Sequence, residues 1–407
     1  MTSARIAAAS NRPMISYLVL GYVALLPYQL QIGDHLNFAV ADCFLLGVLL
    51  LAPAGIQYRK ATWNVWHLAV VLTLLYGAMI AVLRSGTIER YEIFNKCAGL
   101  LLPLLSYAAI TSAVRDWHDM RQILRMFAIG VIVENLVAVG AFLAAYFFGV
   151  SNPFARYGGL RLSGTLLDPN AYGGLLVAAF VVCEGASCGS VRFFPRPILW
   201  ASRLSLGLGI LFTFSRSAWI ALACALVILC VVCTRAAIRV IGVAALGAPA
   251  LVLLMGQRFG RIFGEMASRP KQVEGRFELI RSALQAFGEH PLLGGGLGRF
   301  RLGVGEIAHN TAMWFLADFG IVGLSVFLAF TGWFFVKGWQ AYGLAPLEEK
   351  PLVIALLLAH AAMFGLSMGI EAFYQRPWWM VLALIASSHA LVVRRRSVHN
   401  LSRLAPC

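Results

Sequence analysis

The sequence predicts an all-α, polytopic membrane protein with about twelve transmembrane helices and one long polar segment outside the membrane. The chain has 407 residues, of which 60% are hydrophobic and 13% are charged, and its mean hydropathy is +0.78. A soluble protein of this length could not bury so much apolar surface. Apolar runs of about 20 residues recur, which suits helices that cross the hydrocarbon core, and they lack the alternating polarity of barrel strands.

Charged or polar connectors separate the first five expected spans. We expect these spans at about residues 14–30, 36–56, 65–83, 94–114 and 123–150. A turn at Gly33-Asp34-His35 follows the first span, and Arg59-Lys60 follow the second.

Local signals mark the next four spans. Asp168-Pro169-Asn170 predicts the start of the sixth, because an extended residue precedes proline and a capping side chain is present. The apolar run Pro197–Cys233 is too long for one helix at a rise of about 1.5 Å per residue. Its polar centre, Ser215-Arg216-Ser217, therefore predicts a junction between two spans. A ninth span follows Arg239 and ends near Met255.

The polar segment, about residues 256–308, divides the chain into three parts. Residues 1–255 hold nine expected spans, and residues 309–407 hold three more, at about 310–336, 352–370 and 378–393, with a tail. Two amphipathic helices are expected within the polar segment. Their apolar faces carry Phe259, Ile262, Phe263 and Met266 in the first, and Phe277, Ile280, Leu284 and Phe287 in the second. Arg276, Glu278, Arg281 and Gln285 are expected on the polar side of the second helix.

An even number of spans puts both termini on the same side of the membrane. With the N-terminus in the cytoplasm, every inside connector is basic, as the positive-inside rule requires. These connectors carry Arg59/Lys60, Arg115/Arg121, Arg192/Arg196, Arg235/Arg239, Lys337/Lys350 and Arg394 to Arg396. The net charge of +15 then indicates anionic phospholipid as the partner, and no nucleic acid. The polar segment, the loop 151–168 and the Arg216 junction all lie outside.

Basic residues are frequent in the outside segment. They are Arg258, Arg261, Arg269, Lys271, Arg276, Arg281, Arg299 and Arg301. Arginine can hold phosphate oxygens in pairs, so this surface suits a phosphate-bearing ligand. Contact of a solvated loop with lipid headgroups is the alternative.

Several single positions allow two interpretations. Arg216, between two apolar helices, either faces a cavity or extends its side chain to the interface. His309 opens a helix, where it is either structural or a proton acceptor kept neutral by nearby guanidinium groups. The run Gly294–Gly298 is either a nest for an anion or a simple chain reversal, and we expect the reversal. Asp42, Glu134 and Glu184, within expected spans, are expected either to be buried and hydrogen-bonded or to bridge helices.

Short motifs follow one another between Arg161 and Gly323. They are Gly164-Thr-Leu-Leu-Asp-Pro-Asn170-Ala-Tyr-Gly173, Ser215-Arg216-Ser217, Gly275-Arg276, His290-Pro-Leu-Leu-Gly-Gly-Gly-Leu-Gly298, and His309-Asn310 with Asp318-Phe-Gly320-Ile-Val-Gly323. This ordered set resembles the O-antigen ligase and O-antigen polymerase superfamily. The remainder of the chain is similar only in hydropathy and in the position of the large loop.

The resemblance implies a glycosyltransferase of the bacterial inner membrane whose active site faces the periplasm. Its donor is a glycan on undecaprenyl pyrophosphate. Ligases transfer that glycan to lipid A–core, polymerases to another repeat unit, and relatives to proteins. The reaction inverts the anomeric carbon without a metal, and no cofactor is expected. The sequence also lacks an outside D-x-D or clustered His/Asp set.

The resemblance assigns roles to individual residues. Arg216 and Arg276 match the essential arginines of the family and His309 its essential histidine, so these three are the expected catalytic residues. Arg161, Asn170, Arg281 and Asn310 are expected to bind substrate. A lipid or ion transporter is the alternative outside the enzyme class, and it predicts broken helices with charges at the midplane.

Overall fold

The computed structural model describes residues 3–32, 36–55, 62–85, 96–97, 99–156, 161–166, 168–189, 191–268 and 270–404. The expected turn Gly33-Asp34-His35, the pair Arg59-Lys60 and Arg269 lie outside these residues. The side chains of Arg258, Arg261 and Lys271, and the apolar face expected from Phe259 to Met266, are likewise not described.

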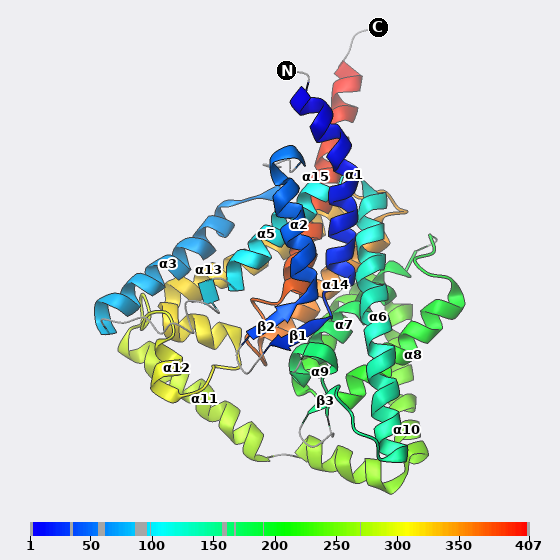
Figure 1. Cartoon of the computed structure of the whole chain (residues 1–407), viewed down its shortest axis with the longest axis vertical. Coiled ribbons are helices and arrows are strands. Elements are labelled where there is room, and N and C mark those ends of the chain that lie inside the picture. Colours follow the sequence, from blue (N-terminus) through cyan, green and yellow to red (C-terminus); the bar gives the residue numbers. More distant parts are fainter. Residues whose placement is uncertain are drawn as a thin grey trace.

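Helices make up most of the described chain (Figure 1). They are α1 Ser3–Ala24, α2 Val40–Gly55, α3 Val65–Ser85, α5 Gly99–Ala113, α6 Trp117–Phe148, α7 Pro169–Ala186, α8 Arg196–Phe212, α9 Arg216–Val232, α10 Thr234–Ser268, α11 Pro270–Glu289, α12 Arg299–Val304, α13 Thr311–Leu344, α14 Lys350–Ser367 and α15 Arg376–Leu404. The strands are β1 Gln29–Ile32, β2 Leu36–Ala39, β3 Ala155–Arg156 and β4 Arg161–Leu162, with one 3₁₀ turn at Gly164–Leu166.

Seven of the described helices are long and apolar enough to cross a membrane. Their membrane-compatible parts are Val65–Arg84, Trp117–Phe148, Pro169–Ala186, Thr234–Leu251, Thr311–Leu344, Lys350–Ser367 and Arg376–Ser397. Shorter apolar helices occur at Met14–Ala24, Val40–Leu51, Gly99–Ala113 and Arg216–Val232. A polytopic helical membrane protein is thus supported, and the total of about twelve spans stays a prediction.

Two antiparallel hairpins depart from the all-α prediction. β1 pairs with β2, and β3 pairs with β4. The first hairpin takes the place of the last residues expected in the first span and the first residues expected in the second. α1 ends at Ala24, before Pro27, and α2 begins only at Val40. Proline stops the helix because it lacks an N–H and clashes with the preceding turn. The alternation of polar and apolar residues in Gln29–Ile32 then suits a strand.

The predicted break in the run Pro197–Cys233 is confirmed. α8 ends at Phe212 and α9 begins at Arg216, with Ser215 as its N-cap. The end of the ninth span near Met255 is also confirmed as a change in direction, because Gly256 interrupts α10 with φ 76°. Glycine adopts this left-handed conformation without the strain that a side chain would cause.

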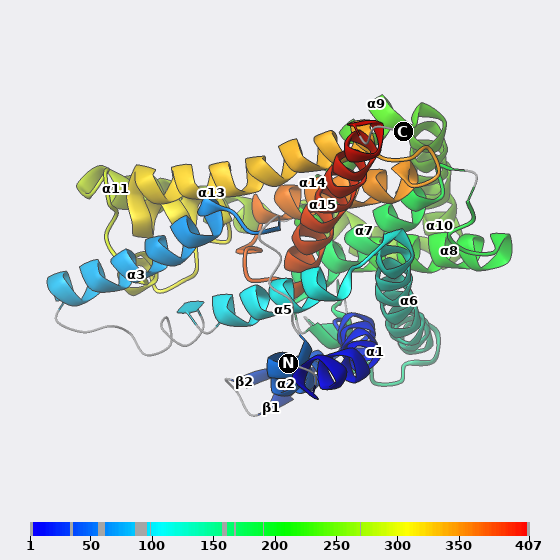
Figure 2. The same cartoon turned by 90° about the horizontal axis from the view of Figure 1, so that it is seen from above.

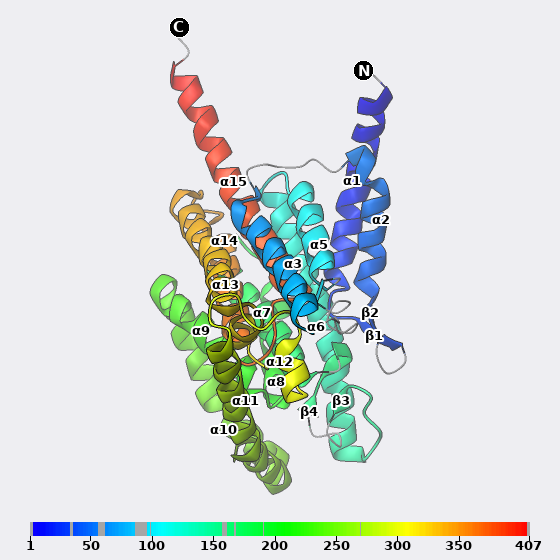
Figure 3. The ribbon, with the colours of Figure 1, turned by 90° about the vertical axis from the view of Figure 1, so that its left-hand side faces the viewer.

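The two ends of the helical assembly hold different parts of the chain. The ends of α1 and α15 nearest the chain termini lie at one end, and the junction of α10 with α11 lies at the other (Figures 1 and 3). The connectors that precede α6 and α14 lie together, because Arg121 near the start of α6 pairs with Glu349 just before α14 at 2.7 Å. At the far end of α6, the Tyr146 hydroxyl donates to the Met255 carbonyl at 2.9 Å, next to the break in α10. The side of the membrane on which each end lies remains a prediction.

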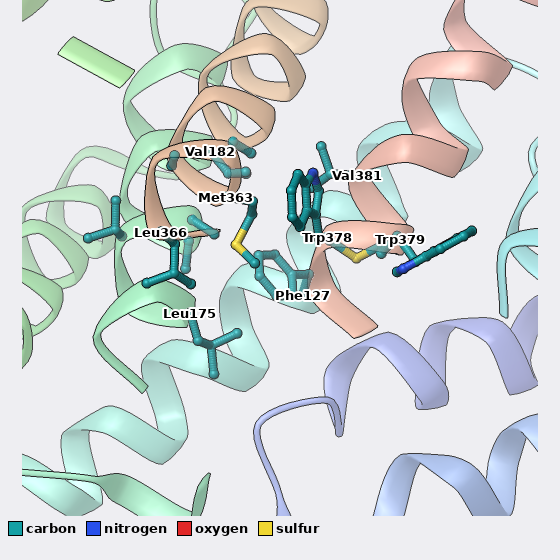
Figure 4. Close-up of a cluster of buried hydrophobic side chains, with 14 of the residues drawn as sticks. Phe127, Leu175, Val182, Met363, Leu366, Trp378, Trp379 and Val381 are labelled. Atoms are coloured by element: carbon teal, nitrogen blue, oxygen red, sulfur yellow. The ribbon is translucent and has the colours of Figure 1, made fainter. Parts of the chain in front are cut away.

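The core lies where α7, α14 and α15 meet. Seen from above, α14 and α15 lie in the middle, with α1 and α2 at one edge and α3 with α13 at another (Figure 2). Apolar side chains from α6, α7, α14 and α15 fill this centre (Figure 4). Trp378, Trp379, Met363 and Leu366 are almost completely buried. This packing gives the site a rigid support at the ends of α7 and α14.

The expected bridging role of the acidic residues within the spans is confirmed. Asp42 of α2 forms a two-point ion pair with Arg376 of α15, at 2.9 and 2.6 Å. Glu184 of α7 pairs with Arg203 of α8. Glu134 of α6 accepts from the Tyr172 hydroxyl of α7 at 2.6 Å. These contacts tie neighbouring helices together, because an unsatisfied polar group in this setting would be costly.

Candidate functional site

Asn170, the second residue of α7, joins several segments at one end of the bundle. Its Oδ1 accepts from Arg161 Nη2 at 2.9 Å and from Ser215 Oγ at 2.9 Å. Its Nδ2 donates to Asp168 Oδ1 at 3.1 Å. Arg161 is 7% exposed, and its Nε donates to the Thr213 carbonyl at 2.8 Å. The structure therefore brings Arg161 and Asn170 together and connects them to the start of α9.

Arg216 is the first residue of α9 and lies in the junction that the sequence predicts. Ser215 caps the helix, because its Oγ accepts from Ala218 N at 3.2 Å. The preceding residue, Phe214, has φ 45°. A bulky residue in this conformation costs about 1–3 kcal/mol and is retained only where its surroundings enforce it. The turn at Phe214 and the Ser215 cap together fix the point at which α9, and with it Arg216, begins.

Arg276 of α11 comes close to Arg216. Its Nη1 donates to Ser217 Oγ of α9 at 3.4 Å. Burial lowers the pKa of the Arg276 guanidinium, the positive charge of Arg216 lowers it further, and the negative charge of Asp168 partly offsets both. Two guanidinium groups from separate segments are thus held near one carboxylate.

The packing of α11 corrects one prediction about its faces. The buried positions are Leu279 and Ala283, and half-buried Arg276 shares that side of the helix. Phe277 and Leu284, expected on the apolar face, are 67% and 49% exposed. Arg276, expected on the polar side with Glu278 and Arg281, is half buried, whereas those two residues are exposed. The reason is that a helix beside a membrane can turn apolar residues outward and its functional cation inward.

Arg281 does not join the arginine pair. It is exposed on α11, and five residues after Arg276 it lies about 140° around the helix. Its expected contact with substrate finds no support in this arrangement and stays a prediction.

His309 and Asn310 form the start of α13. Asn310 caps the helix through Oδ1, which accepts from Met313 N at 3.2 Å, and its Nδ2 donates to the Met368 carbonyl at 3.0 Å. His309 has φ 49°, so it shares with Phe214 a left-handed conformation that is rare for residues other than glycine. Strain at these two positions is consistent with a functional site.

The loop between α14 and α15 connects His309 to the arginines. Met368 contacts Asn310 through the hydrogen bond described above, and the next residue, Gly369, packs against Ser217 so closely that a Cβ would overlap the serine side chain. Ser217 in turn accepts from Arg276. Arg276 and the sequence neighbours of Arg216 and His309, which are Ser217 and Asn310, therefore lie on one connected set of contacts.

The glycine run 294–298 is a chain reversal that docks on α13, as expected, and its described N–H groups are all occupied. Gly295 N donates to the Ala317 carbonyl, Gly296 N to the Asp318 carbonyl and Leu297 N to the Gly77 carbonyl, at 3.0, 2.9 and 2.9 Å. Gly294 N donates to His290 O at 2.9 Å. An anion nest needs free N–H groups, so the nest interpretation fails.

Asp318 explains why the motif around it accompanies the glycine run. Its carboxylate accepts from Gly298 N at 2.9 Å, Phe300 N at 3.0 Å and Trp314 Nε1 at 2.9 Å. Gly320 breaks α13 with φ 66°, and Ile321 N then donates to the Pro291 carbonyl at 2.9 Å. The two motifs thus form one structural joint between the polar segment and α13.

The electrostatics of the site favour an anion. The starts of α7 and α9 meet at the Asn170–Ser215 contact. The start of α13 is linked to them through Met368, which accepts from Asn310, and Gly369, which packs against Ser217. The N-terminus of a helix carries a partial positive charge of about half an electron. Arg216 and Asp168 both act on the charge of the Arg276 guanidinium, and Arg161 and Asp168 both bond to Asn170, so three guanidinium groups and one carboxylate share these contacts. A phosphate or pyrophosphate group matches this excess of positive charge.

Sequence reasoning missed four contributors. Asp168 was expected only as a helix start, and Ser217 only as part of a motif. Lys96 and Glu371, which form an ion pair near His309, were not singled out. Lys96 and Glu371 each lie at the edge of an apolar run, which was the only signal in the sequence. Each partner lies far away from the other along the chain, so the pair could not be predicted.

Among the residues that the structure describes, no group of three or more His, Cys, Asp or Glu side chains could hold a metal ion. The expectation that the chemistry needs no metal remains a prediction.

A match to a known family agrees with this geometry. Residues 201–328 match a protein-family model described as O-antigen ligase. The matched segment runs from α8 into α13 and contains Arg216, Arg276 and His309, whereas Arg161 and Asn170 precede it. The resemblance found in the sequence motifs is thereby confirmed. A comparison with curated proteins finds no match.

Proposed function

We propose that this chain, which residues 201–328 place in the O-antigen ligase superfamily, is an O-antigen ligase of the bacterial inner membrane. It transfers a glycan from undecaprenyl pyrophosphate to lipid A–core at the periplasmic face, during lipopolysaccharide biosynthesis. The polar segment 256–308 and the starts of α7, α9 and α13 then form the periplasmic side.

The observation that carries the proposal is the approach of Arg276 to Arg216 at the start of α9. In the reaction, an acceptor hydroxyl oxygen forms a bond to the anomeric carbon, and the bond from that carbon to the pyrophosphate oxygen breaks with inversion. The leaving pyrophosphate takes the electron pair, so negative charge grows on it. Preorganised cations aimed at growing charge are typically the largest electrostatic contribution to catalysis. Arg216 and Arg276 bind and stabilise the leaving group in this mechanism.

His309 serves the acceptor. The hydroxyl that attacks loses its proton, and a neutral imidazole within hydrogen-bond reach can take it, which contributes about 10²–10⁴-fold. Because pyrophosphate is a good leaving group, orientation of the hydroxyl by His309 also contributes. The half-exposed position of His309 at the start of α13 supports access to an acceptor from outside the bundle.

Arg161, Asn170 and Asn310 contribute to substrate binding mainly because they hold neighbouring residues of the site in position. The amide of Asn170 is engaged by Arg161, Ser215 and Asp168, and that of Asn310 by Met313 and Met368. Asn170 therefore sets the position of the α9 start, and Asn310 sets that of His309.

The same family segment also suits an O-antigen polymerase or a protein O-glycan ligase, which differ only in the acceptor. A transporter is less well supported. α13 is broken at Gly320, as transporter helices often are, but the glycine run 294–298 fills the break with backbone contacts. The break therefore joins two parts of the protein and lines no substrate path among the described residues.

Lipopolysaccharide banding in a deletion strain tests the proposal. Loss of a ligase leaves core without any O-chain, whereas loss of a polymerase leaves core with one repeat unit. Unchanged banding would refute both assignments. Purified protein with undecaprenyl-pyrophosphate-linked glycan and lipid A–core then tests whether the chain alone performs the transfer.

A further inference from the structure

Lys96 and Glu371 form a buried ion pair close to His309. Each side chain is 8% exposed, and Lys96 Nζ meets Glu371 Oε2. Lys96 Nζ also lies 4.3 Å from the centre of the Trp314 ring and 5.1 Å from that of Tyr374. The aromatic faces attract the ammonium group, so Lys96 is held between two rings and one carboxylate.

The second oxygen of Glu371 contacts the backbone beside His309. Oε1 accepts from Ala308 N at 3.0 Å. The residues on either side of Glu371 contact Thr311, which follows the histidine by two positions. Ile370 O accepts from Thr311 Oγ1 at 3.1 Å, and Ala372 N donates to the same Oγ1 at 3.0 Å. One loop, which contains Ile370, Glu371 and Ala372, therefore contacts the chain both before and after the strained residue His309.

These contacts explain how His309 keeps its conformation. A positive φ at a residue other than glycine persists only when the surroundings determine it. Glu371 fixes the Ala308 N–H, just before His309 in the chain. The hydrogen bonds of Asn310 and Thr311 fix the backbone just after it. A buried carboxylate without a cation would carry a large desolvation penalty, so Lys96 is needed to keep the ionised Glu371 in place.

We infer that Glu371 is a positioning residue for His309, and that Lys96 compensates the charge of the buried Glu371 carboxylate. The inference rests on the proposed role of His309 in transfer. Glu371 acts through the Ala308 N–H and the backbone.

Two double variants separate the hydrogen bond from the charges. Lys96→Met with Glu371→Gln removes both charges and keeps a carbonyl oxygen for the Ala308 N–H. Lys96→Met with Glu371→Leu removes both charges and that oxygen. Neither variant leaves a buried charge unpaired, so they differ chiefly in the one acceptor. Glu184→Gln, in a buried ion pair at the other end of α7, controls for the loss of a bridging carboxylate in general.

Two measurements distinguish the outcomes. The first is transfer of glycan from undecaprenyl pyrophosphate to lipid A–core, with KM for the donor and kcat determined separately. The second, which needs no activity, is the rate at which diethyl pyrocarbonate modifies His309 in the purified protein, measured by peptide mass spectrometry with exposed His118 as the reference.

We expect the Met/Gln variant to match the wild type, and the Met/Leu variant to lose about 10²-fold in kcat with an unchanged donor KM, since small misplacements have effects of this size. The modification rate of His309 changes only in the Met/Leu variant. Equal modification and equal transfer in the two double variants would overturn the inference. A difference in modification together with normal transfer by His309→Ala would leave the positioning intact and refute the proposed role of His309.

A further variant covers failure of the double variants to fold. Glu371→Asp keeps the charge opposite Lys96 and withdraws the carboxylate by one methylene. It is expected to lower kcat and to change His309 modification, whereas wild-type values in both would also overturn the inference.

Discussion

Replacement of Arg276 by methionine should remove transfer activity without loss of stability. The side chain is half buried beside another guanidinium group, and its pKa is lowered by burial and by Arg216. A cation with a lowered pKa is less favourable in the folded protein than in the unfolded chain, so at neutral pH its charge destabilises the fold. Methionine preserves much of the volume and removes that charge.

The expected magnitude follows from the role of Arg276 at the leaving group. Loss of one preorganised donor to a developing oxyanion lowers kcat by about 10²–10³-fold, or about 2.7–4 kcal/mol. Lysine retains the charge and loses the paired geometry of the guanidinium group, so Arg276→Lys should fall between the wild type and Arg276→Met. The melting temperature of Arg276→Met should equal or exceed that of the wild type.

The assay uses purified protein with the lipid-linked donor and lipid A–core, and records donor affinity, transfer and melting temperature. Gln285→Met, at an exposed position of the same helix, is the control and should change transfer by less than about threefold. The reasoning fails if Arg276→Met transfers glycan normally, or if Gln285→Met loses as much activity as Arg276→Met does.

Four further outcomes are expected. His309→Ala should abolish transfer with nearly unchanged donor affinity, whereas His309→Asn should keep partial activity if orientation dominates; equal loss of donor binding would assign His309 to the phosphate contacts. Asn170→Ala should lower kcat by about 10²-fold through displacement of the α9 start, and wild-type kinetics would contradict that link. Asp318→Ala should lower the free energy of unfolding by about 3 kcal/mol or more, since three donors lose their acceptor, and an unchanged denaturation midpoint would disprove it. A cysteine at Glu274, in a cysteine-free variant, should react with an impermeant reagent in intact spheroplasts, and labelling only after permeabilisation would reverse the topology.

Local sequence signals predicted two helix starts correctly. The Ser215-Arg216-Ser217 junction and the start of α7 at Asp168-Pro169 depend on residues within a few positions of each other. Capping and backbone geometry are determined over that range. The hairpin β1–β2 was missed because two short alternating segments were read as the ends of longer apolar runs.

Contacts between distant segments could not be derived in the same way. Lys96 and Glu371 are 275 residues apart, and no spacing rule connects them. The packed side of α11 could not be predicted either, because hydrophobic periodicity shows which residues are apolar and not whether protein or lipid covers them. Arg276 was therefore assigned to the polar side of the helix, although its family motif indicated a role.

The loop from Met368 to Arg376 has a consequence for how the protein is made. Its contacts with Ala308, Asn310 and Thr311 complete the surroundings of His309, and it precedes the last described helix. Chains are synthesised from the N-terminus, and the earlier parts fold first. A nascent chain that has inserted α9 and α11 already holds both arginines, yet it has no means to hold the histidine until the end of α14 has emerged. Under the roles proposed for these residues, the arginines that hold the leaving group are therefore made before the loop that positions the histidine.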